Sequence, residues 1–358
     1  MRTIIFRPTN DCNLACQYCY DINNHSDTIQ NIRNRATNKL LANQDALLRG
    51  IQLLFEGERE KILIFHGGEP LLIQPDALDE FCSHLDEGVQ IDIQTNGTLI
   101  DQNVIELFRK YRFRVGISLD GCNEFQNSYR LFRNGNSSFQ TVMSKIKLLQ
   151  DNDIRFGVIM SLSKKHIGCE QELYDFLAQH HISSNIRRVF ASDQFSDTMT
   201  DQEYVDFFNR LYDIWFEDEE CLVETRQIME LSSELENVLV GERTSFCSTS
   251  DDCFRRYISL DVDGNLYACN RLYGVDDFYY GNVDNISMDD LMRKMNQLLS
   301  RRIDRIQQEC AGCSRIAMCN GGCPAEAYDL YHDYTRSNCD YKVKTLIRNH
   351  IKEKLHND

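Results

Sequence analysis

The sequence predicts an α/β protein in which a parallel sheet is followed by a smaller, cysteine-rich part. Over residues 1–190, six short apolar runs alternate with longer segments of helical periodicity. Strands that alternate with helices in this way pair in parallel through right-handed crossovers. Eight of the fifteen cysteines fall within residues 247–358, so the composition changes there. We therefore expect two structural units, joined by residues 191–246.

The predicted strands are the short apolar runs, and the predicted helices carry apolar residues at three- and four-residue spacing. The strands are Thr3–Arg7, Lys61–His66, Val89–Gln94, Arg114–Leu119, Arg155–Leu162 and Asn185–Phe190. The helices between them are Gln44–Phe55, Asp76–Leu85, Asp101–Tyr111, Ser138–Gln150 and Glu170–Gln179. Functional side chains are expected where the strands end, because the carboxyl ends of parallel strands meet at one edge.

Residues 191–246 interrupt this alternation and are predicted to form a helical bridge. Helical periodicity continues over Thr200–Phe216 and Thr225–Val240. The first of these helices carries an aromatic stripe that we assign to the core rather than to a binding groove: Phe207, Phe208, Tyr212 and Trp215. Beyond the bridge, Gly264 marks a hairpin turn.

Composition excludes several classes of function. The formal net charge is -16 and the pI is about 5.0, which argues against binding to a nucleic-acid backbone. The first residues are too charged for a secretory signal, and no apolar run approaches the roughly 20 residues of a membrane span. A cysteine-rich chain without an export signal points to metal rather than to disulfides. We expect a cytoplasmic protein that does not bind membranes.

The segment after the first strand contains Cys12, Cys16 and Cys19 in a C-x3-C-x2-C arrangement, with Tyr18 between the last two. Three thiolates at this spacing suit three irons of a [4Fe–4S] cube, whose usual ligands are cysteine thiolates. The fourth iron then stays open to a group that is not protein. The alternative is a zinc site, although structural zinc normally takes four ligands from the protein.

These motifs resemble those of the radical S-adenosylmethionine enzymes. The second predicted strand runs into His66-Gly67-Gly68-Glu69-Pro70, which is similar to the GGEP motif of that family. The later cysteines resemble the SPASM domain, a C-terminal extension with two auxiliary [4Fe–4S] clusters. The resemblance implies a partial (β/α)6 TIM-type barrel followed by a small SPASM domain. It also implies reductive cleavage of S-adenosylmethionine to a 5′-deoxyadenosyl radical, which abstracts hydrogen from the substrate.

The resemblance also implies which residues bind the cofactor. They are Tyr18, Gly67, Gly68, Glu69, Pro70, Ser118 and Arg130. Glu69 would take the amino group of S-adenosylmethionine, and Arg130 would pair with its carboxylate. The alternatives are that Ser118 belongs to an ordinary turn and that Arg130 is a surface arginine.

Family ligands carried over by position divide the later cysteines into two sets. The first set is Cys247, Cys253, Cys269 and Cys323; the second is Cys310, Cys313, Cys319 and Cys339. With Cys12, Cys16 and Cys19 this gives three [4Fe–4S] clusters, while two zinc sites are the alternative for the later sets. Four ligands close each auxiliary cluster, which favours electron transfer or a structural role. Packing is the expectation for the remaining cysteines: Cys82, Cys122, Cys169 and Cys221.

The order of these motifs along the chain and the residues within them resemble those of two groups of enzymes. The groups are the anaerobic sulfatase-maturating enzymes and the maturases of ribosomally made peptides (RiPPs). The former oxidise cysteine or serine to formylglycine and typically place an aspartate after the cysteine corresponding to Cys269, as a base. This chain has Asn270 there, and an amide cannot accept the proton. We therefore expect a peptide maturase that forms an oxidative crosslink, a cyclophane carbon–carbon bond or a thioether. Formylglycine formation is the alternative, with Asp261, Asp263, Asp120 or His66 supplying the base.

The expected partners follow from the crosslinking function. They are a precursor peptide as substrate, a reducing protein such as flavodoxin or ferredoxin, and a separate leader-binding protein. Since the first strand begins at residue 3 and leaves no room for a leader-binding module before it, we expect a leader to be recognised by the barrel rim, by the bridge or by that separate protein. The remaining hypothesis is that the protein is not an enzyme but an iron–sulfur or zinc-binding partner protein.

Overall fold

The sheet of this protein has nine strands in the order β6-β5-β4-β3-β2-β1-β7-β8-β9. The computed structural model describes residues 2–19, 28–189, 195–218, 250–313, 316 and 320–338. The strands are β1 (Arg2–Arg7), β2 (Lys61–Phe65), β3 (Val89–Thr95), β4 (Arg114–Ser118), β5 (Phe156–Leu162), β6 (Ser183–Arg188), β7 (Tyr257–Asp261), β8 (Asn265–Tyr267) and β9 (Tyr279–Asn282). Pairing is parallel from β6 through to β7, and antiparallel between β7, β8 and β9.

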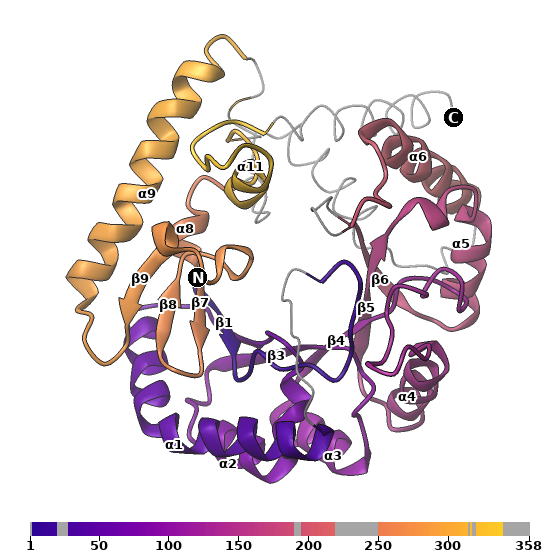
Figure 1. The fold of residues 1–358 in the computed structure, drawn as a ribbon, viewed down its shortest axis with the longest axis horizontal. Coiled ribbons are helices and arrows are strands. Elements are labelled where there is room, and N and C mark those ends of the chain that lie inside the picture. Colours follow the sequence, from indigo (N-terminus) through magenta and orange to yellow (C-terminus); the bar gives the residue numbers. More distant parts are fainter. Residues whose placement is uncertain are drawn as a thin grey trace.

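The helices α1–α6 lie on the outer side of the curved sheet, as Figure 1 shows. The α-helices are α1 (Ile29–Phe55), α2 (Pro75–Ser83), α3 (Gln102–Tyr111), α4 (Phe139–Asp151), α5 (Glu170–Gln179), α6 (Asp201–Glu217), α8 (Cys253–Arg256), α9 (Met288–Glu309) and α11 (Pro324–Tyr331). Short 3₁₀ turns are η1 (Pro70–Leu72), η2 (Lys164–His166), η4 (Asn270–Leu272) and η5 (Asp276–Phe278). The predicted α/β class with a parallel, partial barrel is confirmed.

All six predicted strands of the first part are present, with ends that differ by one or two residues. The prediction was wrong about α1, which begins at Ile29 rather than near Gln44. Thr28 caps this longer helix, its side chain accepting a hydrogen bond from the backbone N–H of Asn31. The early turns bury single residues such as Ile32, Ala36 and Leu40 between polar ones, so their apolar stripe is narrow. The predicted helix Thr225–Val240 lies outside the described residues.

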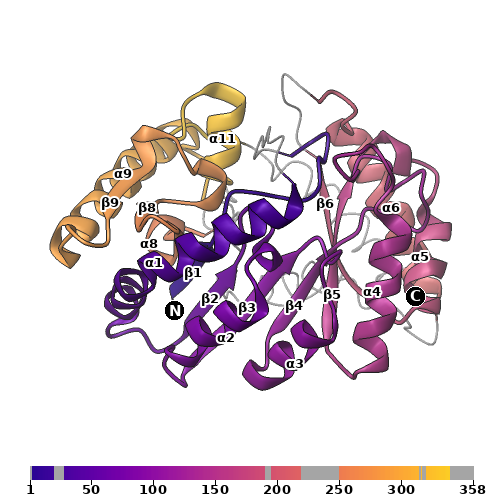
Figure 2. The same cartoon turned by 60° about the horizontal axis from the view of Figure 1, so that its bottom comes forward.

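The cysteine-rich part continues the sheet of the first part. Strand β7 pairs in parallel with β1, in a register that places Ile5 opposite Ser259. One hydrophobic cluster extends from Ile4 and Phe6 of β1 to Leu291 and Met295 of α9. Figure 2 shows β8, β9 and α9 on the β1 side of the molecule. The strand β1, paired with β2 and β7, therefore connects the strands of the first part to those of the cysteine-rich part.

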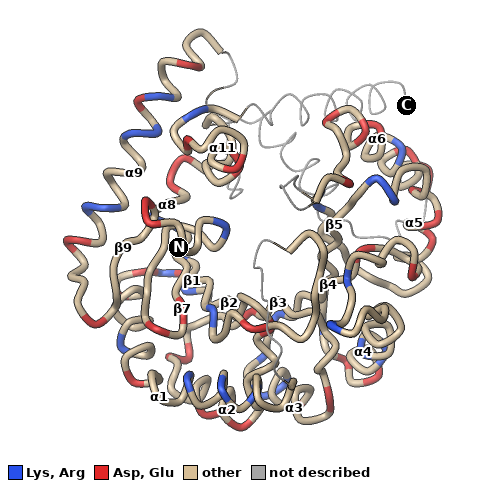
Figure 3. Tube along the Cα trace, viewed as in Figure 1, with Lys and Arg blue, Asp and Glu red and all other residues tan. Residues whose placement is uncertain are grey.

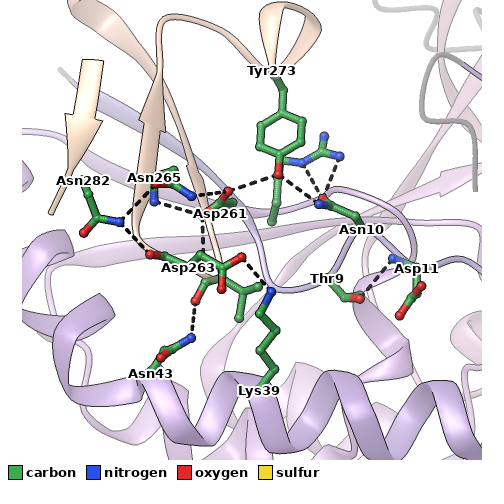
Figure 4. A network of polar contacts seen from close by, with 12 residues as sticks. Thr9, Asn10, Asp11, Lys39, Asn43, Asp261, Asp263, Asn265, Tyr273 and Asn282 are labelled. Atoms are coloured by element: carbon green, nitrogen blue, oxygen red, sulfur yellow. Dashed lines mark hydrogen bonds and ion pairs between the residues drawn. The ribbon is translucent and has the colours of Figure 1, made fainter. Parts of the chain in front are cut away.

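A hairpin joins β7 to β8 at the expected turn. Gly264 has φ of +81°, which glycine adopts without strain. The preceding residues of the turn contact α1: Lys39 forms an ion pair of 2.6 Å with Asp263, and Asn43 donates to the carbonyl of Val262. Figure 4 shows these contacts between the hairpin and α1. The unpredicted first half of α1 thus holds the hairpin in place.

Acidic and basic side chains are interspersed along the outer helices, as Figure 3 shows. The excess of acidic residues is therefore spread over the surface of the part drawn. Among the helices that the structure describes, none combines the length and apolarity needed to cross a membrane.

Candidate active site

The cysteine loop, residues 8–19, follows β1 at the carboxyl edge of the sheet. The segment 129–133 runs beside it as a short strand-like partner. Ala15 N–H donates to the carbonyl of Leu131 over 2.8 Å, and Gln17 N–H donates to that of Tyr129 over 3.0 Å. Arg133 donates to the carbonyl of Cys12. The backbone that carries the three cysteines is thus fixed by a segment more than a hundred positions later.

Gly67 and Gly68 allow the loop after β2 to touch the cysteine loop. A Cβ atom on Gly68 would lie 2.0 Å from the carbonyl oxygen of Asp11, and one on Gly67 would lie 2.7 Å from that of Thr9. The backbone N–H of Glu69 donates to the carbonyl of Asp11 over 2.7 Å. The two glycines therefore serve close packing of one loop on the other.

Glu69 is fully buried and joins the ends of two strands. Its carboxylate accepts hydrogen bonds from the Thr95 hydroxyl at 2.6 Å, from Asn96 N–H at 2.8 Å and from Leu71 N–H at 2.9 Å. Burial raises the pKa of Glu69 to about 7, against the lowering effect of these donors. A carboxylate has about four acceptor positions, and three are already used. Binding of the cofactor amino group by Glu69 stays a prediction.

The other residues predicted to bind the cofactor lie at the same edge. Pro70 begins the turn η1, which Glu69 caps. Ser118 ends β4 and accepts a hydrogen bond from Gln94 Nε2 on β3 over 3.0 Å. Arg130 lies beside Tyr18, with its guanidinium 5.4 Å from the centre of the ring. The structure thus brings all of these residues to the carboxyl ends of β1 to β4.

The environment of the cysteine thiols fits an iron–sulfur cluster. Burial raises the pKa of Cys12, and it raises that of Cys16 to about 11, so both need a positive partner to ionise. Nitrogen donors surround the sulfurs. Leu14 N–H donates to Cys12 Sγ over 3.4 Å and Asn96 Nδ2 donates to it over 3.7 Å, while the positive charge of Arg130 opposes the effect of burial on the pKa of Cys16. Hydrogen bonds to ligand sulfurs are a usual feature of such clusters.

The three thiols do not meet at one point. Cys12 interacts electrostatically with both Cys16 and Cys19. Within the described residues, however, no three cysteine, histidine or carboxylate side chains are arranged to hold a single metal ion. A cube places each thiolate on a different iron and so requires separated sulfurs. Ligation of a [4Fe–4S] cluster by Cys12, Cys16 and Cys19 stays a prediction, and the geometry is compatible with it.

A buried arginine occupies the edge between β1 and β7. Arg7 Nη1 donates to Asn270 Oδ1 over 2.8 Å, and its Nε and Nη2 both donate to Asn10 Oδ1. The guanidinium stacks 4.0 Å from the centre of the Tyr273 ring. Asn10 donates to the Tyr273 hydroxyl, which in turn donates to Asp261. Figure 4 shows Asn10, Tyr273 and Asp261 of this network beside the hairpin.

His66 lies next to Arg7 and is neutral near pH 7. Burial and the Arg7 charge lower its pKa to about 4. Its Nδ1 accepts a hydrogen bond from Gly67 N–H at 2.7 Å, which places the ring proton on Nε2. In this form Nε2 is a donor, so His66 is a poor candidate for the base. Asp261 already accepts from Asp263 N–H, Asn265 N–H and Tyr273, which makes it a turn-forming residue.

Three of the four cysteines predicted for the first auxiliary cluster are described. Cys269 interacts electrostatically with Cys323, and Tyr280 interacts with both Cys253 and Cys269. Cys247 lies outside the described residues. For the second set, Cys310 and Cys313 follow the end of α9, and the other two, Cys319 and Cys339, also lie outside the described residues.

Arg302 of α9 organises the segment that carries Cys323. Its guanidinium donates to the carbonyls of Gly321, Gly322, Tyr334 and Arg336. Because the side chain is buried, it crosslinks two stretches of chain without help from solvent.

Sequence reasoning missed several residues that shape the site. Asn13 and Thr98 form a hydrogen-bonded chain with Asn96, from the cysteine loop to the end of β3; Asn96 lay in a segment expected at the site, whereas the roles of Asn13 and Thr98 were not predicted. Arg7 is a charged residue directly after the apolar residues Ile4–Phe6 of β1, which could have marked it as a site residue. Arg302 gave no such signal, since arginine on an amphipathic helix usually faces solvent.

A protein-family profile matches the first part of the chain. The sequence profile of the Radical SAM superfamily matches residues 6–177. These residues are a radical SAM domain. A radical SAM domain implies one [4Fe–4S] cluster and S-adenosylmethionine, so the enzyme is an iron–sulfur enzyme that binds this cofactor.

Curated relatives extend the similarity beyond the radical SAM domain. A cysteine-type anaerobic sulfatase-maturating enzyme of Clostridium novyi is 26% identical over 94% of this chain and 91% of its own. A serine-type anaerobic sulfatase-maturating enzyme of Bacteroides thetaiotaomicron is 24% identical over 90% of this chain and 82% of its own. The similarity thus includes the cysteine-rich part.

Solved structures share the whole fold. Native anSMEcpe with bound AdoMet superposes with a TM-score of 0.80 and 20% identity, covering 100% of this chain and 99% of the other. The same protein with bound AdoMet and Cp18Cys peptide gives a TM-score of 0.79 and 21% identity, over 99% and 98% of the two chains. The fold of this chain, including the sheet extended by β7, β8 and β9, is thus shared with these solved structures over nearly their whole length.

The predicted crosslinking function, with its cyclophane or thioether product and RiPP substrate, is wrong. The relatives that match nearly the full chain include sulfatase-maturating enzymes of both types. The prediction depended on Asn270 alone. In the structure this residue is buried and accepts a hydrogen bond from Arg7, so the substitution is accommodated locally. The leader-binding protein was expected only because of the crosslinking function, so it is not supported either.

Proposed function

We propose that this chain is a sulfatase-maturating enzyme that oxidises a cysteine or serine side chain of a peptide or protein substrate to formylglycine. The observation that carries the proposal is the extent of the match. Relatives with this activity align with 94% and 90% of the chain, across both the radical SAM domain and the cysteine-rich part. The geometry supports it through a cluster-binding loop packed against the GGEP segment at one edge of the sheet.

The reaction has a defined balance. The substrate carbon loses one hydrogen atom, its sulfur or oxygen loses one proton, and one electron leaves the site. For a cysteine, water then replaces sulfur to give the aldehyde and hydrogen sulfide. When bound, the cluster and S-adenosylmethionine supply the radical that removes the hydrogen atom. The residues of the chain hold the cysteine loop, exclude water and place charge beside the substrate.

The electron leaves through two further [4Fe–4S] clusters in this proposal. Their ligands are the two sets of cysteines named above, so the chain holds three clusters in all. Support comes from Cys269 and Cys323, which interact electrostatically, and from Tyr280, which interacts with both Cys253 and Cys269. Burial raises the pKa of Cys323 to about 11, as expected for a thiol that ionises only against a metal.

The partners in this proposal are a substrate peptide and an electron donor. A solved structure of the same fold holds the Cp18Cys peptide. A flavodoxin or ferredoxin would supply the electron that starts the reaction.

The test is anaerobic turnover of sulfatase-type peptides that carry either cysteine or serine at the reacting position. The reconstituted enzyme, S-adenosylmethionine and a reductant should give a product that reacts with hydrazide reagents. The Cys12→Ala/Cys16→Ala/Cys19→Ala variant is the control and should give none. A crosslinked product, or no aldehyde from either peptide, would overturn the proposal.

A further inference from the structure

A cavity of about 530 Å³ lies at the amino-terminal edge of the sheet, where β4 and β5 begin. Its lining comes from the two connections that lead from α3 into β4 and from α4 into β5. A strand of five residues, such as β4, spans about 15 Å. The candidate active site is at the other end of these strands, so the cavity is separate from it.

The two connections that form the cavity have the same backbone turn. After α3, the N–H of Phe113 donates to the carbonyl of Phe108 over 3.0 Å, and after α4, the N–H of Ile154 donates to that of Leu149 over 3.0 Å. The residue before each donor has a positive φ, 53° in the first turn and 56° in the second. This is the Schellman arrangement of a helix end. Because the turns match, the chain enters β4 and β5 in the same way.

The lining is strongly basic. Four arginines contribute to it: Arg109, Arg112, Arg114 and Arg155. Asp153 is the only acidic residue in the lining, so four positive charges less one negative give a formal charge of +3. The whole chain, by contrast, carries a formal net charge of -16. Positive charge is therefore concentrated at this cavity against the balance of the chain.

These arginines are exposed and lack a counter-charge. The side chains of Arg112, Arg114 and Arg155 form no ion pair or hydrogen bond with any residue that the structure describes. Arg109 donates only to a neutral group, the carbonyl of Asn152, over 3.0 Å. Like charges held together repel, and an anion between them removes the repulsion.

Two of the arginines are neighbours across the sheet. The register places Val115 of β4 opposite Phe156 of β5, so Arg114 lies beside Arg155, one residue earlier on each chain segment. Neighbouring strands are about 4.8 Å apart. Asp92 of β3 is the register partner of Arg114 on its other side, but it does not line the cavity. Paired guanidinium groups suit phosphate oxygens, which they can bind through two parallel hydrogen bonds each.

The remaining wall of the cavity is largely apolar. Ile154 and Phe156 are half-buried and so expose apolar surface, while Phe113 and Val115 are buried. Small-molecule sites typically combine such walls with a few charged groups, in volumes of about 300–1,000 Å³. A nucleoside diphosphate has an aromatic base and carries about three negative charges at neutral pH. Its charge and its apolar part both match this lining.

We propose that the cavity binds a phosphorylated small molecule of the nucleoside diphosphate class. Its phosphate groups lie between Arg114 and Arg155, and its base lies on the apolar wall that includes Phe156. The bound molecule links the connections before β4 and β5. This site does not depend on the clusters, on the substrate or on formylglycine formation.

The test is isothermal titration calorimetry with ADP on the full-length, anaerobically reconstituted protein. Saturating S-adenosylmethionine is present without reductant, so that ADP does not enter the cofactor site. The wild type should bind one ADP per chain, more weakly as the salt concentration rises. Arg114→Gln/Arg155→Gln should weaken binding at least about tenfold, because charge-assisted hydrogen bonds are lost at both positions. Arg59→Gln is the matched control, since Arg59 is exposed before β2 at the same edge but does not line the cavity.

The unfolding midpoint without ADP should be the same in the wild type and both variants, because the replaced side chains are exposed. No binding of ADP to the wild type at millimolar concentration overturns the proposal. Equal affinity in Arg114→Gln/Arg155→Gln, or an equal loss in Arg59→Gln, also overturns it.

Two further ligands test the class of molecule. Pyrophosphate that binds as tightly as ADP overturns the assignment of the apolar wall to a base. An oligoglutamate peptide that binds where ADP does not overturns the proposal in favour of an acidic peptide partner. Failure of formylglycine formation would leave ADP binding unaffected, so the two proposals fail separately.

Discussion

Arg7 donates a hydrogen bond of 2.8 Å to Asn270. A buried cation therefore lies beside the position at which sulfatase-maturating enzymes were expected to carry an aspartate base. A cation stabilises a thiolate, and an unperturbed cysteine has a pKa of about 8.5. A serine hydroxyl, by contrast, needs an adjacent base. For the proposed sulfatase maturase, we therefore predict a preference for cysteine over serine substrates.

A cysteine-containing peptide should be turned over at least about tenfold faster than its serine counterpart, since a general base contributes about 10²–10⁴-fold. Asn270→Asp should raise serine turnover more than cysteine turnover, by introducing a carboxylate. Asn270→Ala is the control and should raise neither. Equal rates for the two peptides in the wild type would contradict this specificity, and aldehyde formation measured by mass spectrometry provides the rates.

Gly68→Ala should disrupt the packing of the GGEP segment on the cysteine loop. The new Cβ would lie 2.0 Å from the carbonyl oxygen of Asp11, so backbone must move. Overpacking of this kind costs about 1–3 kcal/mol or more. We expect a lower unfolding midpoint and less bound iron after reconstitution. Gly88→Ala is the matched control, because nothing lies within 4 Å of a Cβ there, and it should leave both measurements unchanged.

Arg302→Lys should loosen the segment that carries Cys323. A lysine cannot donate to four carbonyls at once, and buried carbonyls without partners cost about 1–3 kcal/mol each. We expect a loss of about 3 kcal/mol or more in unfolding free energy, with less iron retained. Arg305→Lys on the same helix alters an exposed pair with Glu309 and should change stability little. Similar effects of the two substitutions would refute this role of Arg302.

His66 should make stability depend on pH. Its pKa is about 4 when folded and 6.5 ordinarily, so the unfolded chain binds the extra proton between these values. The difference in unfolding free energy between wild type and His66→Asn should rise with pH from about 4 to 6.5, by up to about 1.4 kcal/mol per pH unit. Glu69 has the opposite effect from about 4.5 to 7, but it is present in both proteins and cancels. His84→Asn, at an exposed site, is the control; a flat difference for His66→Asn would show that the surroundings of His66 do not lower its pKa.

Metal content tests the cluster assignment. Three [4Fe–4S] clusters correspond to roughly twelve irons per chain. The Cys12→Ala/Cys16→Ala/Cys19→Ala variant should lose about a third of them and all cleavage of S-adenosylmethionine. Bound zinc with only about four irons in the wild type would refute the two auxiliary clusters. Iron, sulfide and zinc analysis of the anaerobically reconstituted protein provides the measurement.

The sequence was sufficient for what depends on local periodicity. The apolar runs located the strands, because a buried parallel strand is apolar on both faces. The cysteine spacing and the GGEP segment located the edge at which the site forms. Gly264 correctly marked the hairpin, because few residues other than glycine adopt its backbone conformation.

The contacts between residues far apart in the chain could not be predicted from the sequence. Nothing local to Arg7 indicates Asn270, which is 263 positions away, and nothing near Cys12 indicates the segment 129–133. The same limit explains the functional error. Asn270 was interpreted as the loss of a base, whereas its effect depends on the cation that tertiary structure places beside it.

The parallel pairing of β7 with β1 limits where the chain can be divided in evolution or in protein engineering. A strand bonded on both sides has no edge, and β1 acquires its second neighbour only from the cysteine-rich part. Cutting the chain between the two parts would leave β1 with a row of unpaired backbone groups, which invites aggregation. The radical SAM domain of this protein is therefore not a detachable module, and chimaeras should be joined within loops outside the sheet rather than at its boundary.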